Sequence, residues 1–179
     1  GIAGLTATAA FAELGYSVLC VDPAPLISER DTKGADLRST AFLQPARALL
    51  AEIGLWERLA PYAEALQIMR IIDAGGETSE ARAIKEFNAA DISELPFGWN
   101  LPNWLLRREM SAHLATLKNV DYRTGVSART LFTRTSEARV GLSDGTRVKA
   151  KLVVAADGRG SAMREAAGIS VSTTRFGQK

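Results

Sequence analysis

The amino-acid sequence predicts a three-layer α/β domain with a parallel sheet, interrupted by a small β-rich insertion. Three features carry this prediction. A turn with two glycines opens a helix of small residues over 2–14, and the apolar run Val18–Val21 follows it and ends at Asp22. A second apolar run, Leu152–Ala156, ends in the same way at Asp157. Continuous apolar runs of this length are typical of parallel strands buried on both faces, so we expect both runs in one sheet.

The composition is that of an ordinary soluble globular chain. Of its 179 residues, 46% are hydrophobic and 23% are charged, which is enough apolar material for a buried core. The net charge is only +2 and no basic stripe occurs, so nothing favours a nucleic-acid partner. The single cysteine, Cys20, and the single histidine, His113, exclude a disulfide and a His/Cys zinc site within this chain.

The first third of the chain alternates helix and strand signals, with glycine and proline at the boundaries. Gly15 stops the first helix, Pro45 can open the second, and Gly54 follows its end. The elements expected here are helices over 2–14, 45–53 and 55–65, a strand over 18–21, and a charged loop over 26–39.

The remainder of the chain is richer in β signals. Two strand-like runs flank Gly75-Gly76 and predict a hairpin, and Asp144-Gly145 predicts another turn between strands. Asn103 can cap a helix whose apolar residues share one face. The elements expected here are strands over 66–73, 81–87, 120–122, 128–134, 138–142 and 147–154, an acidic loop over 88–95, and a helix over 103–117.

The opening Gly1-Ile2-Ala3-Gly4 fits the second half of a Gly-x-Gly-x-x-Gly turn, the Rossmann signature for a dinucleotide. In such a turn, glycines let the backbone approach the pyrophosphate at a helix N-terminus, and an acid about 20 residues on takes the ribose hydroxyls. Asp22 stands 18 residues after Gly4, at the end of the next strand. The alternative is a glycine pair that merely packs a helix on a strand. The helix, the strand and Asp22 together favour dinucleotide binding.

The second motif is Asp157-Gly158-Arg159-Gly160-Ser161, at the end of the second apolar run. Ligands of open α/β sheets bind where strands end and turn into helices. The alternative is an ordinary strand-to-helix turn with Ser161 as the helix N-cap. The spacing alone does not choose between the two.

Other polar residues give weaker signals. Arg38 lies in a polar loop before a helix, where its planar fork suits phosphate, although a loop arginine is usually just solvated. Arg107 and Arg108 lie on the helix expected over 103–117, and an exposed helix face is the alternative for both. No catalytic side chain and no metal site are predicted, because the carboxylates over 77–94 lack metal-ligand spacing and the single histidine and cysteine lack partners.

These segments, in this order, resemble the N-terminal half of the flavin-dependent aromatic hydroxylases, the p-hydroxybenzoate hydroxylase-like group. Within that group the chain is most similar to the ubiquinone-biosynthesis hydroxylases of the UbiH/UbiF family, which Arg38-Ser39-Thr40-Ala41 with Gly54-Leu55-Trp56 favours. The match covers nearly the whole chain. The segments that carry it are 1–5, 21–25, 37–41, 49–56, 97–103 and 156–164.

The resemblance implies that eight residues bind cofactors. Gly1 and Gly4 line the pyrophosphate of FAD, and Asp22 binds its adenosine ribose. Glutamate is usual at that place, so the shorter Asp22 needs a closer approach or a water. Arg38 meets FAD and the incoming nicotinamide cofactor, and Arg107 contacts FAD. Asp157 and Gly158 serve both FAD and NAD(P)H, and Arg164 supports them.

The resemblance further implies an FAD-dependent aromatic monooxygenase. In that family NAD(P)H reduces FAD, and the reduced flavin uses O₂ to hydroxylate an activated ring, so the protein positions the reactants and needs no catalytic side chain. The implied substrate is a small aromatic or prenylated phenol or quinol, such as a ubiquinone precursor. The alternatives are another Rossmann-type flavoprotein oxidoreductase and a nucleotide-binding module without oxygenase activity.

The resemblance also predicts the organisation of the protein. Residues 1–65 and 103–179 are expected to form part of an FAD/NAD(P)-binding domain, and 66–102 the start of a substrate-domain insertion. The first glycine with its strand, and the distal half of the hydroxylases, are expected outside residues 1–179. This part alone is therefore expected to be inactive and to self-associate through exposed sheet edges. A cytoplasmic location is implied, with peripheral association with the inner membrane or with ubiquinone-biosynthesis proteins left open.

Overall fold

The computed structural model describes residues 1–75 and 80–177 of the chain. Gly76 of the predicted hairpin turn and Glu77 lie outside the described residues. The chain folds into two compact units, one formed by Gly1–Leu26 with Leu114–Lys179 and the other by Ile27–His113. The two ends of the chain therefore belong to one unit, and the middle of the chain forms the other.

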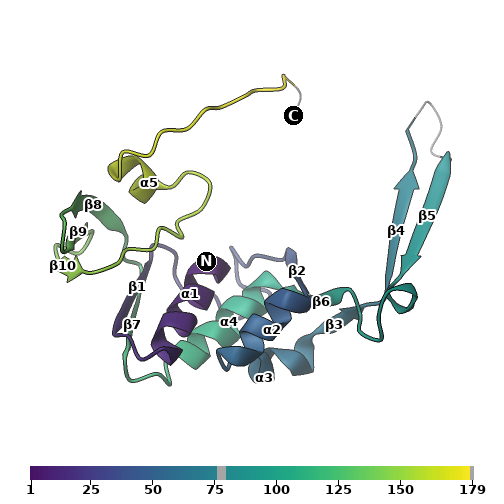
Figure 1. Ribbon diagram of the computed structural model, residues 1–179, viewed down its shortest axis with the longest axis horizontal. Helices are drawn as coiled ribbons and strands as arrows, with labels where there is room; N and C mark the ends of the chain where they lie inside the picture. The colour runs from purple at the N-terminus through teal and green to yellow at the C-terminus, as the bar shows by residue number, and fades with distance from the viewer. Residues whose placement is uncertain (76–79, 178–179) are drawn as a thin grey trace. The chain divides into compact units, whose positions relative to one another are not determined.

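The first unit begins with a helix packed on a strand. Helix α1 (Ile2–Glu13) packs on β1 (Val18–Asp22), which pairs in parallel with β7 (Val120–Thr124), as Figure 1 shows. The Asn119 side-chain amide donates a hydrogen bond of 2.9 Å to the Ala12 carbonyl, which joins the end of α1 to the start of β7. The predicted first helix and the predicted parallel strand are both confirmed, although most of β1 is half-buried rather than buried.

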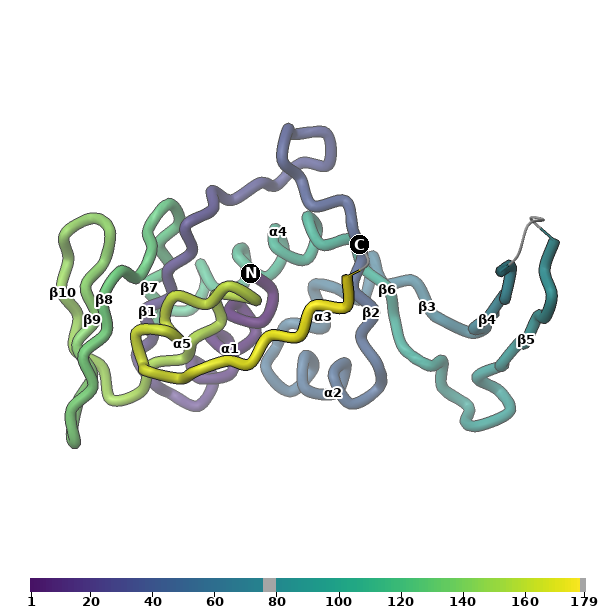
Figure 2. The backbone as a smooth tube through the Cα atoms, turned by 90° about the horizontal axis from the view of Figure 1, so that it is seen from above, coloured from purple at the N-terminus to yellow at the C-terminus, as the bar shows by residue number. Residues whose placement is uncertain are grey.

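A three-stranded antiparallel sheet also belongs to the first unit. It consists of β8 (Ala128–Thr133), β9 (Ala138–Leu142) and β10 (Arg147–Ala150) in the order β10-β9-β8, which lie side by side in Figure 2. Helix α5 (Ala162–Ala166) packs against β8. The sequence predicts all three strands, but the last one ends at Ala150 rather than at Val154.

The segment Leu152–Ala156 differs from its prediction as a buried strand. In the structure this segment has no strand conformation, and it shares no sheet with β1 or with any other described strand. Leu152 is 63% exposed and Val154 is 52% exposed, whereas the prediction was a buried strand. An apolar run becomes a strand only where a neighbour completes its hydrogen-bond ladder, and no described residue supplies one here.

The second unit combines a small antiparallel sheet with helices. Its strands are β2 (Ser39–Leu43), β6 (Gly98–Pro102) and β3 (Glu64–Leu66), in the order β2-β6-β3. Its helices are α2 (Gln44–Glu52), α3 (Trp56–Leu59) and α4 (Asn103–Leu114). The buried residues of these elements include Phe42, Leu50, Leu55, Trp56, Leu59, Leu101, Leu106 and Met110.

Close contacts fix the position of β6 within the second unit. A Cβ on Gly98 would lie 2.3 Å from the Phe42 carbonyl oxygen, so only glycine fits where β6 meets β2. The rings of Trp99 and Trp56 meet edge to face with centroids 5.4 Å apart, and the Arg47 guanidinium lies 5.2 Å from the Trp56 ring. These contacts hold the strand that leads directly into α4.

The second unit also carries a β-hairpin. Strands β4 (Ile68–Asp73) and β5 (Ala83–Asn88) pair antiparallel, as predicted, and stand out as two long arrows in Figure 1. The helix predicted over 55–65 is correct only for α3, because Ala60–Tyr62 forms a 3-10 turn and the next residues join the sheet as β3. A second 3-10 turn, Ala89–Asp91, follows β5 in the predicted acidic loop.

Candidate functional site

The glycine turn and Asp22 meet in the first unit. Asp22 is the last residue of β1 and is 8% exposed. Its Oδ2 lies 2.7 Å from the Gly1 nitrogen, and its Oδ1 accepts a hydrogen bond from the Ala24 N–H at 2.9 Å. The structure thus brings the two parts of the first predicted motif into contact.

The start of α1 is formed by the glycine turn. No described side chain caps this helix, and its first turn holds no acidic residue. A Cβ on Gly1 would meet no described atom within 4 Å. A Cβ on Gly4 would lie 3.5 Å from the Cβ of Ala156, which brings α1 close to the Asp157 turn. Backbone N–H groups at a helix N-terminus can donate hydrogen bonds to phosphate oxygens.

Asp157 organises the second predicted motif. Its carboxylate accepts hydrogen bonds from the Ser161 hydroxyl and from the Met163 N–H, the latter at 3.1 Å. The Ser161 hydroxyl accepts a bond of 3.0 Å from the Arg164 N–H and so caps α5. Burial raises the pKa of Asp157, but these hydrogen bonds outweigh it and bring the pKa below its usual value. The structure therefore contains the helix-capping turn that the sequence offers as the alternative for this motif.

Gly158 holds this turn in a backbone conformation that other residues rarely adopt. Its φ is +86°, and a Cβ there would meet no described atom within 4 Å. The effect of replacing Gly158 with alanine therefore depends only on the cost of holding alanine at a positive φ. We expect Gly158→Ala to lower the free energy of unfolding of the full-length protein by about 1–2 kcal/mol in chemical denaturation. Gly160→Ala, in the same turn without the positive φ, should change it by less than about 0.5 kcal/mol. Equal losses in the two variants would contradict this account.

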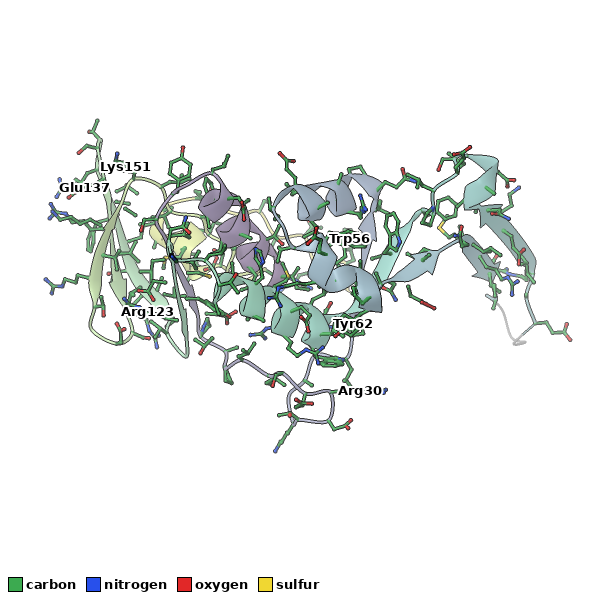
Figure 3. The ribbon with its side chains drawn as sticks, turned by 90° about the horizontal axis from the view of Figure 1, so that it is seen from below. Arg30, Trp56, Tyr62, Arg123, Glu137 and Lys151 are labelled. Carbon is green, nitrogen blue, oxygen red and sulfur yellow. The ribbon has the colours of Figure 1, made fainter. Side chains whose placement is uncertain are left out.

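Arg164 follows the turn on α5. Its Nη2 lies 3.4 Å from Oε1 of Glu165, and its Nε is buried without a hydrogen-bond partner among the described residues. Arg164 also lines an open cavity of about 590 Å³ within the first unit. Glu137 and Lys151, both labelled in Figure 3, line the same cavity. The supporting role expected for Arg164 stays a prediction.

In the second unit, Asp36 holds Arg38 by two parallel hydrogen bonds. Nε of Arg38 donates to Oδ1 of Asp36 at 2.8 Å, and Nη2 donates to Oδ2 at 2.7 Å. The Arg38 side chain is nevertheless 83% exposed. The Arg38 guanidinium holds the pKa of Asp36 well below its usual range, so the carboxylate is ionised at neutral pH. This loop arginine is therefore fixed in place and not merely solvated.

Asn103, the first residue of α4, completes this cluster. Its Nδ2 donates to Oδ2 of Asp36 at 3.0 Å, and its Oδ1 accepts from the Thr40 hydroxyl at 2.6 Å. Its backbone N–H donates to the Arg38 carbonyl at 2.8 Å. The sequence indicates Asn103 only as a helix cap, because partners 63 and 67 positions away give no local signal. Arg107 lies one turn further along α4 and is half-buried.

The eight candidate residues fall into two groups. Six belong to the first unit and two, Arg38 and Arg107, to the second. The first group offers backbone donors and carboxylates of the kind that bind a nucleotide, and the second offers cations that suit phosphate. Neither group contains a nucleophile. Burial raises the pKa of Cys20, the one thiol, which disfavours its nucleophilic thiolate form.

Two kinds of feature are absent from the part of the chain that the structure describes. No group of three or more His, Cys, Asp or Glu side chains there could hold a metal ion. None of the helices in residues 1–75 and 80–177 has both the length and the apolar character that crossing a bilayer requires.

Comparison with known families and curated proteins identifies the relatives of this chain. A family model described as an FAD binding domain matches residues 1–177. The chain is 33% identical over 181 residues to ubiquinone hydroxylase UbiL of Rhodospirillum rubrum, covering 99% of this chain and 40% of that protein. It is 27% identical to 3-demethoxyubiquinol 3-hydroxylase of Escherichia coli, covering 99% of this chain and 44% of that protein. The chain thus spans less than half the length of these curated relatives.

Solved structures share the fold. P. aeruginosa PqsL, in complex with 2-aminobenzoylacetate, matches with a TM-score of 0.75 at 20% identity over 98% of this chain and 46% of that one. p-Nitrophenol 4-monooxygenase PnpA from Pseudomonas putida matches with a TM-score of 0.72 at 19% identity over 93% of this chain and 41% of that one. Identities this low concern the fold alone, and they confirm the predicted α/β class. With the family match over 1–177, the chain belongs to the FAD-binding-domain family.

Proposed function

We propose that the protein containing this chain is an FAD-dependent, NAD(P)H-using monooxygenase that hydroxylates the aromatic ring of a ubiquinone precursor. One observation carries the proposal: the glycine turn and Asp22 are in contact in a chain of the FAD-binding-domain family. Two curated relatives are named as hydroxylases of ubiquinone or demethoxyubiquinol, which supports the reaction and the substrate class. Their names favour this function over another flavoprotein oxidoreductase or a nucleotide-binding module without oxygenase activity.

The residues of the first unit fit FAD. The backbone of the glycine turn at the start of α1 offers N–H donors to pyrophosphate oxygens, and the Asp22 carboxylate suits ribose hydroxyls. The Asp157–Gly158 turn approaches α1 through Ala156 and completes this group. When bound, FAD supplies the redox and oxygen chemistry that these side chains lack. The residues themselves bind and orient it.

Three arginines are the proposed cationic contacts for cofactor phosphates. The Arg38 side chain is exposed and bonded to Asp36, so its guanidinium is accessible to an incoming nicotinamide cofactor. Arg107 stands one turn beyond Asn103 on α4, and we assign it to FAD. Arg164 has a buried Nε without a described partner, which supports a role near the Asp157 turn.

The organisation and partners of the whole protein belong to the same proposal. Residues 1–65 and 103–179 form part of the FAD/NAD(P)-binding domain, and residues 66–102 begin the substrate-binding insertion. The substrate is a small aromatic or prenylated phenol or quinol. Exposed apolar side chains on the hairpin in this insertion support a prenylated substrate: Ile68, Ile71, Ile72 and Ile84. Peripheral association with the inner membrane, or with other ubiquinone-biosynthesis proteins, is proposed on the resemblance to the ubiquinone-biosynthesis hydroxylases alone.

The test of this function uses the full-length protein. We expect it to purify with bound FAD, to oxidise NAD(P)H, and to place one oxygen atom from isotopically labelled O₂ on the ring of a demethoxyubiquinol-type phenol, as detected by mass spectrometry. FAD binding with NAD(P)H oxidation, but without labelled product from any phenol or quinol, would favour another flavoprotein oxidoreductase. Failure to bind FAD would overturn the proposal as a whole.

A further inference from the structure

Asp36 makes more hydrogen bonds than an exposed ion pair requires. Its carboxylate accepts from Nε and Nη2 of Arg38, from the Arg38 backbone N–H at 3.2 Å, and from Nδ2 of Asn103 at 3.0 Å. Its backbone carbonyl accepts from the Trp104 N–H at 3.1 Å. Asp36 therefore ties the residues that precede β2 to the first residues of α4.

The contact with Asp36 uses only one edge of the Arg38 guanidinium. A guanidinium has five N–H groups in a planar fork, and Asp36 takes one from Nε and one from Nη2. No described residue accepts a hydrogen bond from Nη1. Because the side chain is 83% exposed, the edge formed by Nη1 and Nη2 is open to a ligand. Two parallel N–H groups on one edge match two oxygens of a phosphate.

We propose that Asp36 is a positioning residue, which fixes the Arg38 guanidinium so that its open edge meets the pyrophosphate of a dinucleotide cofactor. This inference rests on the proposed cofactor role of Arg38. An exposed arginine side chain loses rotamer freedom when a ligand fixes it. Asp36 has already removed much of that freedom, so binding at the open edge costs less.

The negative charge of Asp36 opposes this effect, because it repels an anionic ligand. The two effects differ in their dependence on salt. Salt reduces this repulsion only in part at physiological ionic strength, because both anions would bind one guanidinium and the Debye length is about 8 Å. The orientation of Arg38 by two directional hydrogen bonds is a short-range effect that screening leaves largely intact. We therefore expect orientation to outweigh repulsion at about 0.15 M salt.

The chain offers a matched control for the loss of an exposed Asp-x-Arg pair. On β7, Nε of Arg123 donates to Oδ2 of Asp121 at 3.0 Å, and Nη2 donates to the same oxygen at 2.6 Å. Figure 3 labels Arg123. Asp121 and Arg123 have the same spacing in the sequence as Asp36 and Arg38. The Arg123 guanidinium lowers the pKa of Asp121, so this carboxylate is ionised as well. Neither residue belongs to the proposed cofactor site.

The experiment measures equilibrium binding to the full-length holoenzyme. NAD⁺ and NADP⁺, which do not reduce the flavin, are titrated by calorimetry, and FAD is titrated into the apoprotein by fluorescence quenching. We expect Arg38→Ala to weaken binding of the preferred nicotinamide dinucleotide by about tenfold and Asp36→Ala by about fivefold. FAD binding should change less in both. The double variant should bind no more weakly than Arg38→Ala, because Asp36 acts through Arg38. Asp121→Ala should stay within about twofold of the unmodified protein.

The outcomes separate this inference from the proposed function. Unchanged dinucleotide binding in Arg38→Ala would overturn the cofactor role of Arg38 itself. Weaker binding in Arg38→Ala, with unchanged or tighter binding in Asp36→Ala, would overturn only the positioning role. A loss from Asp36→Ala that persists in the Arg38→Ala background would mean that Asp36 acts through Asn103 and the fold, and this too would overturn it. If Asp36→Ala does not fold, Asp36→Asn, which keeps the shape and one acceptor, gives the same test.

Discussion

Replacing Asp22 with alanine is expected to weaken FAD binding by the full-length protein by about 10- to 150-fold. Lost hydrogen bonds to a charged group cost on the order of 1.5–3 kcal/mol, and this range corresponds to that change in affinity. Asp22 ends β1, its carboxylate is almost fully buried, and it lies 2.7 Å from the Gly1 nitrogen, where a dinucleotide would place its ribose. Quenching of FAD fluorescence on titration into apoprotein measures the affinity.

A second variant separates the role of Asp22 in the ligand site from its role in the fold. Asp22 also accepts a hydrogen bond from the Ala24 N–H, so Asp22→Ala can loosen the chain after β1. Asp22→Glu keeps the charge and matches the residue usual in similar hydroxylases, so it should retain FAD affinity within about threefold. Thermal melting of the apoproteins reports any change in stability. Equal FAD affinity of Asp22→Ala and the unmodified protein would remove Asp22 from the site.

Features of the first unit that depend on neighbouring residues could be predicted from the sequence. Helix α1 forms where small and apolar residues recur at helical spacing, and Gly15 ends that pattern. The cap of α5 follows from one serine at the right distance from the Arg164 N–H. Asp22 could be proposed as a ligand because a strand of apolar residues ends in an acid. Each of these signals lies within a few residues of the feature it predicts.

Features that depend on distant partners could not be predicted in the same way. Leu152–Ala156 has the composition of a buried strand, but strand formation requires a paired neighbour, and the described residues contain none. Strand β2 has five residues and an exposed majority, and it forms because β6, about 60 positions later, pairs with it. The bond between Asp36 and Asn103 spans 67 positions. Such contacts arise from tertiary packing, so no local pattern marks them.

Replacing Arg38 with alanine is expected to slow flavin reduction by NAD(P)H at least tenfold when the nicotinamide cofactor is below saturation. A charge-assisted contact to phosphate contributes on the order of 1.5–3 kcal/mol, and the open edge of Arg38 is the group that would make it. FAD retention should change less, within about threefold, because the backbone donors at Gly1 and α1 remain. Stopped-flow absorbance of the full-length enzyme measures reduction, and fluorescence titration measures FAD affinity.

Lysine at the same position tests whether the fork of Arg38 matters or only its charge. Lysine carries a point charge and cannot keep two parallel bonds to Asp36 while presenting a second edge to a ligand. Arg38→Lys should therefore recover only part of the lost reduction rate, and it should show a steeper fall with added salt than the unmodified enzyme, because its attraction for the ligand depends on charge alone. Full recovery of the reduction rate in Arg38→Lys would mean that Arg38 contributes only its positive charge. An unchanged rate in Arg38→Ala, with FAD bound, would mean that Arg38 contacts only Asp36 and solvent.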